Sequence, residues 1–124
     1  MEVAEVVINI VDYDMVQQMS LSSCEYPKGT DEFIKSGFTP QKATMVTPPM
    51  VKESKIKLEC KVNQVIPLGT EGGAGNLVLA EVLVMHIDES VLNTDNMIDQ
   101  TKLDLVARLG SNWYARINNA SLFE

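Results

Sequence analysis

Apolar and polar residues alternate in different ways along this chain, and each pattern predicts a strand of a different kind. Residues 6–11 are mostly β-branched and predict a buried strand with neighbouring strands on both sides. Residues 55–62 alternate charged and apolar side chains, which predicts one solvated face and one buried face. Residues 76–87 are more continuously apolar and predict a second long strand covered on both faces. A last short strand is expected over residues 112–117.

The connection between the two long strands is rich in glycine, so an antiparallel hairpin is their simplest pairing. Its run from Gly69 to Gly75 also invites comparison with a phosphate-binding loop. The run lacks the Gly-Lys-Ser/Thr ending of such a loop and leads into a strand. Without a helix N-terminus it has no dipole to hold a phosphate. The pattern therefore favours a flexible hairpin turn over a phosphate loop.

Short helices are expected at three places along the chain. Asp12 is placed to cap the first helix, and Thr30 is placed to cap a second helix that Gly37 ends. Asp99 is expected to open a third helix that runs to Gly110. The spacing therefore predicts short helices interspersed among the strands.

Two segments predict irregular structure, residues 20–29 by their polar composition and residues 39–49 by their prolines. The elements together predict a single α+β domain in which antiparallel strands dominate. Only three or four strands are visible, and a closed barrel needs more. The chain is therefore expected to form part of a sheet whose other strands come from elsewhere.

Charge narrows the range of partners. The 124 residues include 10 Lys+Arg and 17 Asp+Glu, so the formal net charge is 10 − 17 = −7. Nucleic acids and anionic membrane surfaces attract clustered cations, so neither is expected as a partner. The longest apolar stretch, residues 77–85, is interrupted by Glu81 and is far shorter than the roughly 20 residues of a membrane helix. The acidic residues after Met1 do not resemble a secretory signal, and a cytoplasmic location is expected.

Residues that could carry out catalysis are few. Cys24 and Cys60 form no Cys-x-x-Cys pair, so two reduced thiols are expected, and with one histidine they cannot supply four zinc ligands. The histidine, His86, is expected to be a half-exposed strand residue with no nucleophile motif beside it. Residues 25–29 place a ring, a proline turn and an ammonium on one loop. This loop is either a solvated turn or a binding loop.

Several segments, in the same order along the chain, resemble one family. They are residues 7–11, 15–20, 23–29, 32–33, 58–62, 72–78, 81–82, 102–110 and 113–116. The chain resembles the flavin reductase-like family, the FMN-binding split-barrel flavoproteins that include flavoredoxin. The resemblance spans nearly the whole chain.

The resemblance implies a mainly antiparallel α+β fold, an FMN-binding split β-barrel with short helices that forms a homodimer or higher oligomer. It also implies hydride or electron transfer between NADH or NADPH and FMN, in which the flavin performs the hydride chemistry. No catalytic side chain and no metal ligand is assigned. In family members, several barrel strands precede the strand that resembles residues 6–11. Residues 1–124 are therefore expected to be the C-terminal portion of a flavin reductase-like split-barrel domain, and the barrel to be partial.

The resemblance also suggests which residues contact the cofactor. Lys28 stands where the family has a basic residue near the flavin, and it would stabilise negative charge on reduced FMN. Tyr26 would cover the ring or shape the nicotinamide pocket. Asn76 stands near the position of a histidine in some relatives and offers an amide hydrogen bond. The expected cofactor-binding residues are Ser22, Ser23, Tyr26, Lys28, Gly29, Asn76, Trp113 and Tyr114.

Three functions are compatible with these observations. The first is an NAD(P)H:flavin oxidoreductase that oligomerisation or another chain completes. The second is a truncated split-barrel domain that binds no flavin and acts as an oligomerising scaffold through its unpaired strand edges. The third is an FMN electron carrier without nicotinamide activity. Flavin binding and an NADH oxidation assay separate the three.

Overall fold

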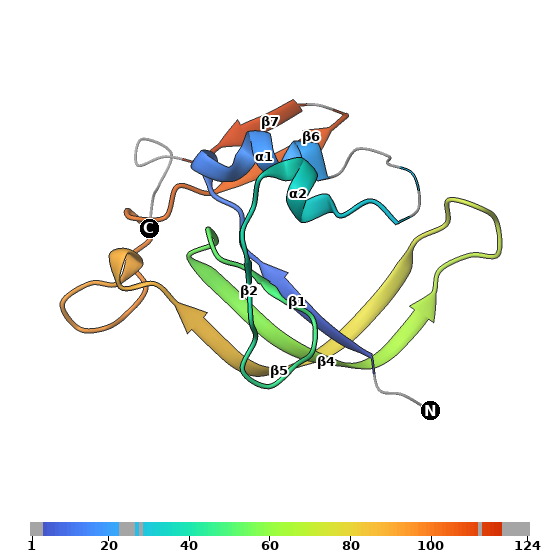
Figure 1. Cartoon of the computed structure of the whole chain (residues 1–124), viewed down its shortest axis with the longest axis horizontal. Helices are drawn as coiled ribbons and strands as arrows, with labels where there is room; N and C mark the ends of the chain where they lie inside the picture. The colour runs from blue at the N-terminus through green and yellow to red at the C-terminus, as the bar shows by residue number, and fades with distance from the viewer. Residues whose placement is uncertain (1–3, 23–26, 28, 112, 118–124) are drawn as a thin grey trace.

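The computed structural model of this chain describes residues 4–22, 27, 29–111 and 113–117 and is built on a three-stranded antiparallel sheet. The sheet has the order β1 (Glu5–Asn9), β4 (Ile56–Pro67) and β5 (Asn76–Ile87). Strands β4 and β5 form a long hairpin that projects to one side (Figure 1). The pairing predicted from the glycine-rich connection is therefore confirmed.

Two smaller antiparallel pairs and four short helical segments complete the described part of the chain. The strand pairs are β2 (Pro40–Gln41) with β3 (Met50–Val51), and β6 (Val106–Gly110) with β7 (Trp113–Arg116). The helical segments are η1 (Tyr13–Met15), α1 (Val16–Ser22), α2 (Glu32–Ser36) and η2 (Glu89–Val91). Figure 1 shows α1, α2 and the β6–β7 pair together on one side of the molecule, away from the long hairpin.

The helix expected from Asp99 to Gly110 is wrong. The Asp99 carboxylate accepts hydrogen bonds from the backbone N–H and the hydroxyl of Thr101, at 2.9 and 2.6 Å, and so closes a local turn. The residues of β6 pair with β7, and Gly110 and Ser111 adopt positive φ where the two strands connect. Strand pairing has overridden the helical spacing of the apolar residues.

The other expected caps are partly right. Helix α2 has its N-cap at Asp31, one residue after the expected Thr30, and the Asp31 side chain accepts a backbone hydrogen bond at 2.9 Å. Gly37 ends α2 in the left-handed conformation, as expected. Asp12 precedes η1 without capping it through its side chain, and its carboxylate instead pairs with Lys55 at 3.1 Å.

The charged face of β4 is covered, although the alternation suggested a solvated face. Lys57 and Glu59 are buried. Residues 39–54, here called the strap, run across this face of the sheet (Figure 1). Three strap residues, Ala43, Val46 and Met50, form the hydrophobic core cluster, with apolar side chains from β1 and β5 packed against it.

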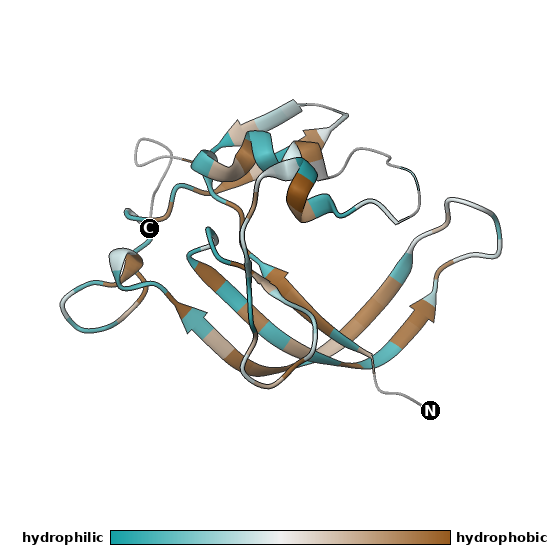
Figure 2. Cartoon of the chain, viewed as in Figure 1, coloured by the Kyte–Doolittle hydropathy of each residue, from teal (hydrophilic) through white to brown (hydrophobic). Residues whose placement is uncertain are grey.

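The opposite face of the sheet carries apolar side chains from all three strands and is exposed along the two outer strands, while Cys60 at its centre is buried. Ile8 pairs with Leu58, which pairs with Met85, and the outer two are 43% and 54% exposed. Figure 2 shows the apolar positions along β1, β4 and β5. The open face is defined by Val6, Ile8, Leu58, Val82 and Met85. The expectation that residues 6–11 form a buried central strand is therefore wrong, because β1 lies at the edge of the sheet and is only partly buried. The expectation that residues 76–87 are covered on both faces is also wrong.

One carboxylate attaches the strap to the sheet. Glu59 is 0% exposed and accepts hydrogen bonds from the backbone N–H groups of Thr44, Met45 and Val46 at 2.9, 2.6 and 3.2 Å. Nε2 of His86 lies 2.5 Å from the same carboxylate. Burial raises the pKa of Glu59, but the hydrogen bonds from His86 and the three N–H groups outweigh it and lower the pKa to about 2. Glu59 is therefore an ionised carboxylate inside the protein.

Replacing this carboxylate should loosen the strap. We expect Glu59→Gln to lower the free energy of unfolding by about 3 kcal/mol, because an amide cannot accept all four hydrogen bonds and leaves buried donors unpaired. Urea unfolding at neutral pH measures the loss. Since the folded pKa of about 2 lies below the ordinary 4.5, the stabilisation by Glu59 is present above pH 4.5 and is lost as the pH falls towards 2.

A strap carboxylate at an exposed position provides the control. Glu53 accepts the Thr39 N–H at 2.8 Å in an exposed position, so Glu53→Gln should cost less than about 1 kcal/mol. The acid-induced loss of stability should be smaller in Glu59→Gln than in the wild type. Equal costs for the two substitutions, or an unchanged acid profile in Glu59→Gln, would contradict the role given to Glu59.

Candidate functional site

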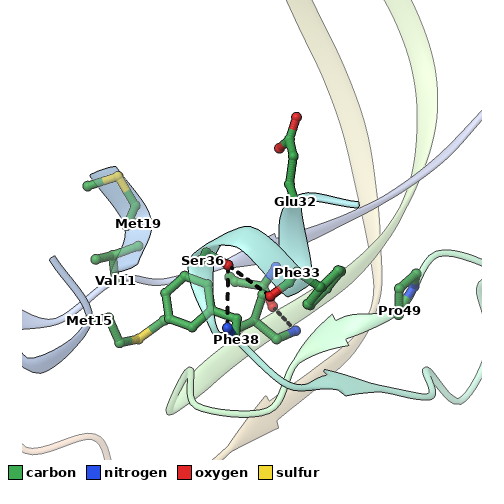
Figure 3. Close-up of a pocket in the computed structure, with 10 residues that line it drawn as sticks. Val11, Met15, Met19, Glu32, Phe33, Ser36, Phe38 and Pro49 are labelled. Carbon is green, nitrogen blue, oxygen red and sulfur yellow. Dashed lines mark hydrogen bonds between the residues drawn. The ribbon is translucent and has the colours of Figure 1, made fainter. Parts of the chain in front are cut away.

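An apolar cavity of about 320 Å³ lies where the helices meet the strap and the end of β1 (Figure 3). This volume is at the lower end of the range of about 300–1,000 Å³ that is usual for small-molecule pockets. Met15 and Phe38 are buried in its wall. The full lining is Asn9, Val11, Met15, Met19, Glu32, Phe33, Ser36, Phe38, Pro49 and Val51.

A single tight turn positions the two phenylalanines of this cavity. Gly37 adopts φ +80 and donates its N–H to the Phe33 carbonyl at 3.0 Å. The Ser36 hydroxyl donates to the same carbonyl and accepts the Phe38 N–H, both at 3.4 Å (Figure 3). The chain therefore reverses directly after α2, and both rings line the same cavity.

The strap forms the opposite wall of the cavity. The side-chain oxygen of Asn9, at the end of β1, accepts the Val51 N–H at 2.9 Å. Lys52 donates its N–H to the Thr39 carbonyl at 2.8 Å and holds the two ends of the strap together. Pro49 and Val51 reach the cavity from this segment. The shape of the cavity therefore depends on the strap.

Five of the eight predicted cofactor residues lie at the last residue of α1 and in the connection from α1 to α2. Ser23, Tyr26 and Lys28 lie outside the described residues, and of Ser22 only the backbone, at the end of α1, is described. Gly29 adopts φ +93, within a turn closed by an N–H···O bond of 3.1 Å between residues 30 and 27. The connection joins two helices that both line the apolar cavity.

The other three predicted residues lie in two different sheets. The Tyr114 hydroxyl is 4.0 Å from Sδ of Met19, a residue that lines the apolar cavity. Trp113, its neighbour in β7, is exposed. Asn76 begins β5 opposite Pro67 and is exposed on the long hairpin. The structure thus brings Tyr114 towards the apolar cavity but records no contact of Asn76 with it.

A second, polar cavity of about 430 Å³ lies near the ends of β4 and β5 that are far from the hairpin turn. Strand pairing sets Lys57 directly beside His86 in its wall. His86 has the half-exposed character expected from the sequence, but its contact with Glu59 was not predicted. The lining residues are Gln41, Ser54, Lys55, Lys57, Met85, His86, Ile87 and Asp88.

Two further findings concern metals and membranes. Within the residues that the structure describes, no group of three or more His, Cys, Asp or Glu side chains is placed to hold a metal ion. No helix in the described ranges is long and apolar enough to span a membrane. Cys60 is a free, buried thiol, and Cys24 lies outside the described residues.

Comparison with known sequences identifies similar proteins. The profile of the family described as flavin reductase like domain matches residues 1–104. An uncharacterized protein of Halalkalibacterium halodurans is 33% identical over 117 residues, which are 93% of this chain and 56% of that protein. An uncharacterized protein of Aquifex aeolicus is 26% identical over 116 residues, which are 94% of this chain and 57% of that protein.

Solved structures share the fold. Nitrilotriacetate monooxygenase component B from Bacillus cereus is 27% identical with a TM-score of 0.86, over 97% of this chain and 59% of that one. A protein with a split barrel domain from Shewanella frigidimarina is 27% identical with a TM-score of 0.82, over 97% and 60%. Flavoredoxin of Desulfovibrio vulgaris, at 24% identity and a TM-score of 0.75 over 91% and 58%, shares the fold. These neighbours confirm the expected split-barrel fold class, and this chain spans 56–60% of the length of the proteins compared.

The turn that positions the two phenylalanines is open to test. We expect Gly37→Ala to lower the free energy of unfolding by about 1 kcal/mol, because a Cβ is strained at φ +80 and would lie 3.2 Å from the Gln18 side chain. Gly72→Ala is the matched control, since its Cβ would meet nothing within 4 Å and its φ is not in the left-handed region. Chemical denaturation measures both. Equal stabilities of the two variants would show that the turn after α2 is not strained.

Proposed function

This chain belongs to the flavin reductase-like domain family, and we propose that it binds FMN and takes part in hydride transfer between NADH or NADPH and that flavin. The observation that carries the proposal is the family match over residues 1–104, which includes both helices of the apolar cavity and the connection between them. Because the chain spans 56–60% of its solved and curated relatives, we assign it a share of a flavin site rather than a complete one.

The apolar cavity fits the flavin ring but not the phosphate. Most of its wall consists of methionine, phenylalanine, valine and proline side chains, which suit a planar aromatic ring. The charged residue in its described wall is Glu32, and none of the lining residues is a cation that could pair with a phosphate. We therefore propose that the ring lies against Phe33 and Phe38, and that cations outside the cavity bind the phosphate.

The residues of this chain would bind and orient the cofactor. FMN, when bound, supplies the hydride-accepting chemistry. Phe33 and Phe38 exclude water from the ring. Lys28 offers an ammonium to the negative charge of reduced flavin, and Tyr26 covers the ring or borders the nicotinamide. These roles of Lys28 and Tyr26 follow from the family resemblance.

Flavin titration tests this assignment. We expect the purified full chain to quench FMN fluorescence in a saturable way, and Lys28→Ala to weaken the affinity about tenfold, because it removes a charged partner of the flavin. Lys42→Ala, an exposed strap lysine away from the apolar cavity, is the control and should bind as the wild type does. NADH oxidation with bound FMN then separates a reductase from an electron carrier without nicotinamide activity.

Two results would contradict the proposal. A wild-type chain that leaves FMN fluorescence unchanged at saturating concentrations, while folded by circular dichroism, would favour the scaffold without flavin. An affinity equal in Lys28→Ala and Lys42→Ala would remove Lys28 from the site.

We also propose that a second copy of the chain covers the open face. The face carries apolar side chains from all three strands, exposed on the two outer ones, and the charged side chains Lys57, Glu59 and Lys61 of β4 point to the other side. Two copies with a net charge of −7 each can therefore approach here without apposing like charges. An exposed apolar surface of this kind marks a contact surface, and a second copy matches it with the same surface.

Light scattering after size exclusion tests the second copy. The wild-type chain should have the mass of a dimer, and Val82→Glu should raise the dimer dissociation constant at least tenfold by burying a charge in the contact. Leu68→Glu places the same charge at the exposed hairpin turn, outside the open face, and should leave the dimer intact. A stable wild-type monomer, or an equal loss of dimer in both variants, would contradict the proposal.

A further inference from the structure

Lys57 is a buried ammonium without a carboxylate partner. The residue is 9% exposed, and none of the ion pairs found among the described residues includes it. Its Nζ donates to the side-chain oxygen of Gln41 at 2.7 Å and to the Lys52 carbonyl at 3.3 Å. An ammonium has three N–H donors, so one remains, and Lys57 lines the polar cavity. Burying a charge without a counter-ion is costly, and an anion bound in the cavity would offset that cost.

His86 brings a complementary group to the same cavity. The ionised carboxylate of Glu59 can only accept hydrogen bonds, so Nε2 of His86 carries the proton between them. In the neutral ring this leaves Nδ1 as an acceptor. The side chain is 31% exposed and lines the polar cavity beside Lys57. The cavity therefore combines a cationic donor with a ring nitrogen that accepts a hydrogen bond when the imidazole is neutral.

The surrounding charges are largely engaged elsewhere. Lys55, which also lines the cavity, pairs with Asp12 at 3.1 Å. The Asp88 carboxylate accepts the Ser90 N–H at 2.9 Å. The charged groups that act on Lys57 from the neighbouring segments are Lys52, Glu53 and Asp88. Among the described residues, Lys57 is therefore the cation of the cavity wall that has no ion-pair partner.

We propose that the polar cavity is a binding site for a phosphate group, in which Lys57 binds an ionised oxygen and Nδ1 of His86 accepts a hydrogen bond from a protonated oxygen. Phosphate at neutral pH presents both kinds of oxygen, whereas sulfate has no proton to donate. An acceptor at Nδ1 therefore selects phosphate over sulfate. Inorganic phosphate and a phosphate monoester share this chemistry, and the cavity, at about 430 Å³, leaves room for either.

This site uses other residues than the flavin proposal does, since the two cavities share no lining residue. Calorimetric titration of the flavin-free chain with inorganic phosphate, phenyl phosphate and sulfate at equal ionic strength is the test. We expect saturable phosphate binding and at least tenfold weaker sulfate binding. Tighter binding of phenyl phosphate would identify a monoester as the ligand, and tighter binding of inorganic phosphate would identify the free ion.

NMR of the single histidine of the chain tests the proposed role of its ring directly. His86 is the one histidine in the sequence, so in a protein without a histidine tag its ring nitrogens give unambiguous ¹⁵N resonances. Without ligand the spectrum should show the tautomer protonated at Nε2, and phosphate should shift the Nδ1 resonance while sulfate should not. A shift that is equal for both anions would overturn the role of His86.

Substitutions of two lysines on β4 complete the test. Lys57→Met should weaken phosphate binding at least tenfold, and Lys57→Arg should retain most of it. Lys61→Met, an exposed position on the same strand outside the cavity, should bind as the wild type does. Because Lys57→Met removes a buried unpaired charge, it should unfold at no lower urea concentration than the wild type. Absence of binding to the folded wild type at millimolar phosphate, or equal losses in Lys57→Met and Lys61→Met, would overturn the proposal.

Discussion

The buried carboxylate of Glu59 is the constraint on which the rest of this structure depends. Removing an ionised carboxylate from water costs several kcal/mol unless its acceptor sites are filled, and here four donors fill them. Three of the donors are consecutive backbone N–H groups of the strap, so the chain must wrap tightly around this one side chain. The strap then reaches both cavities. Pro49 and Val51 line the apolar cavity, and Gln41 and Ser54 line the polar one.

Because the strap covers the charged face of the sheet, the opposite, apolar face lacks this cover. A three-stranded sheet with one covered face leaves its second face to solvent, and here the second face carries the apolar side chains. Ile8 and Met85 are exposed although they are in register across the sheet with Leu58. Exposed apolar side chains gathered on one face of a sheet mark a contact surface. The arrangement that buries Glu59 therefore leaves the sheet face on which we propose that a second copy docks.

The sequence pattern could predict which residues share a face, but not which face is covered. Lys57 and Glu59 alternate with Leu58, a pattern that normally marks a solvated face. Here the strap covers this face, through contacts such as that of Thr44 with Glu59, which are 15 residues apart in the sequence. The helix expected before Gly110 failed because its apolar spacing cannot reveal a strand partner in β7. For the same reason the approach of His86 to Lys57 and Glu59 was not predicted. It depends on the strand register that the hairpin turn sets, because the shifts at 59/60 and 62/64 cancel before Lys57, and the spacing of apolar residues within either strand does not encode that register.

Both cavities take part of their wall from the strap, and this shared segment sets the sign of any coupling between their ligands. Gln41 accepts a hydrogen bond from Lys57 at one end of the strap, and Val51 donates one to Asn9 at the other. A ligand that binds either cavity only when the strap is docked stabilises the docked strap, by an amount that grows with its concentration relative to its dissociation constant. The wall of the other cavity is likewise complete only when the strap is docked. Two such ligands would therefore favour one another, and by linkage each would raise the affinity for the other by the same factor.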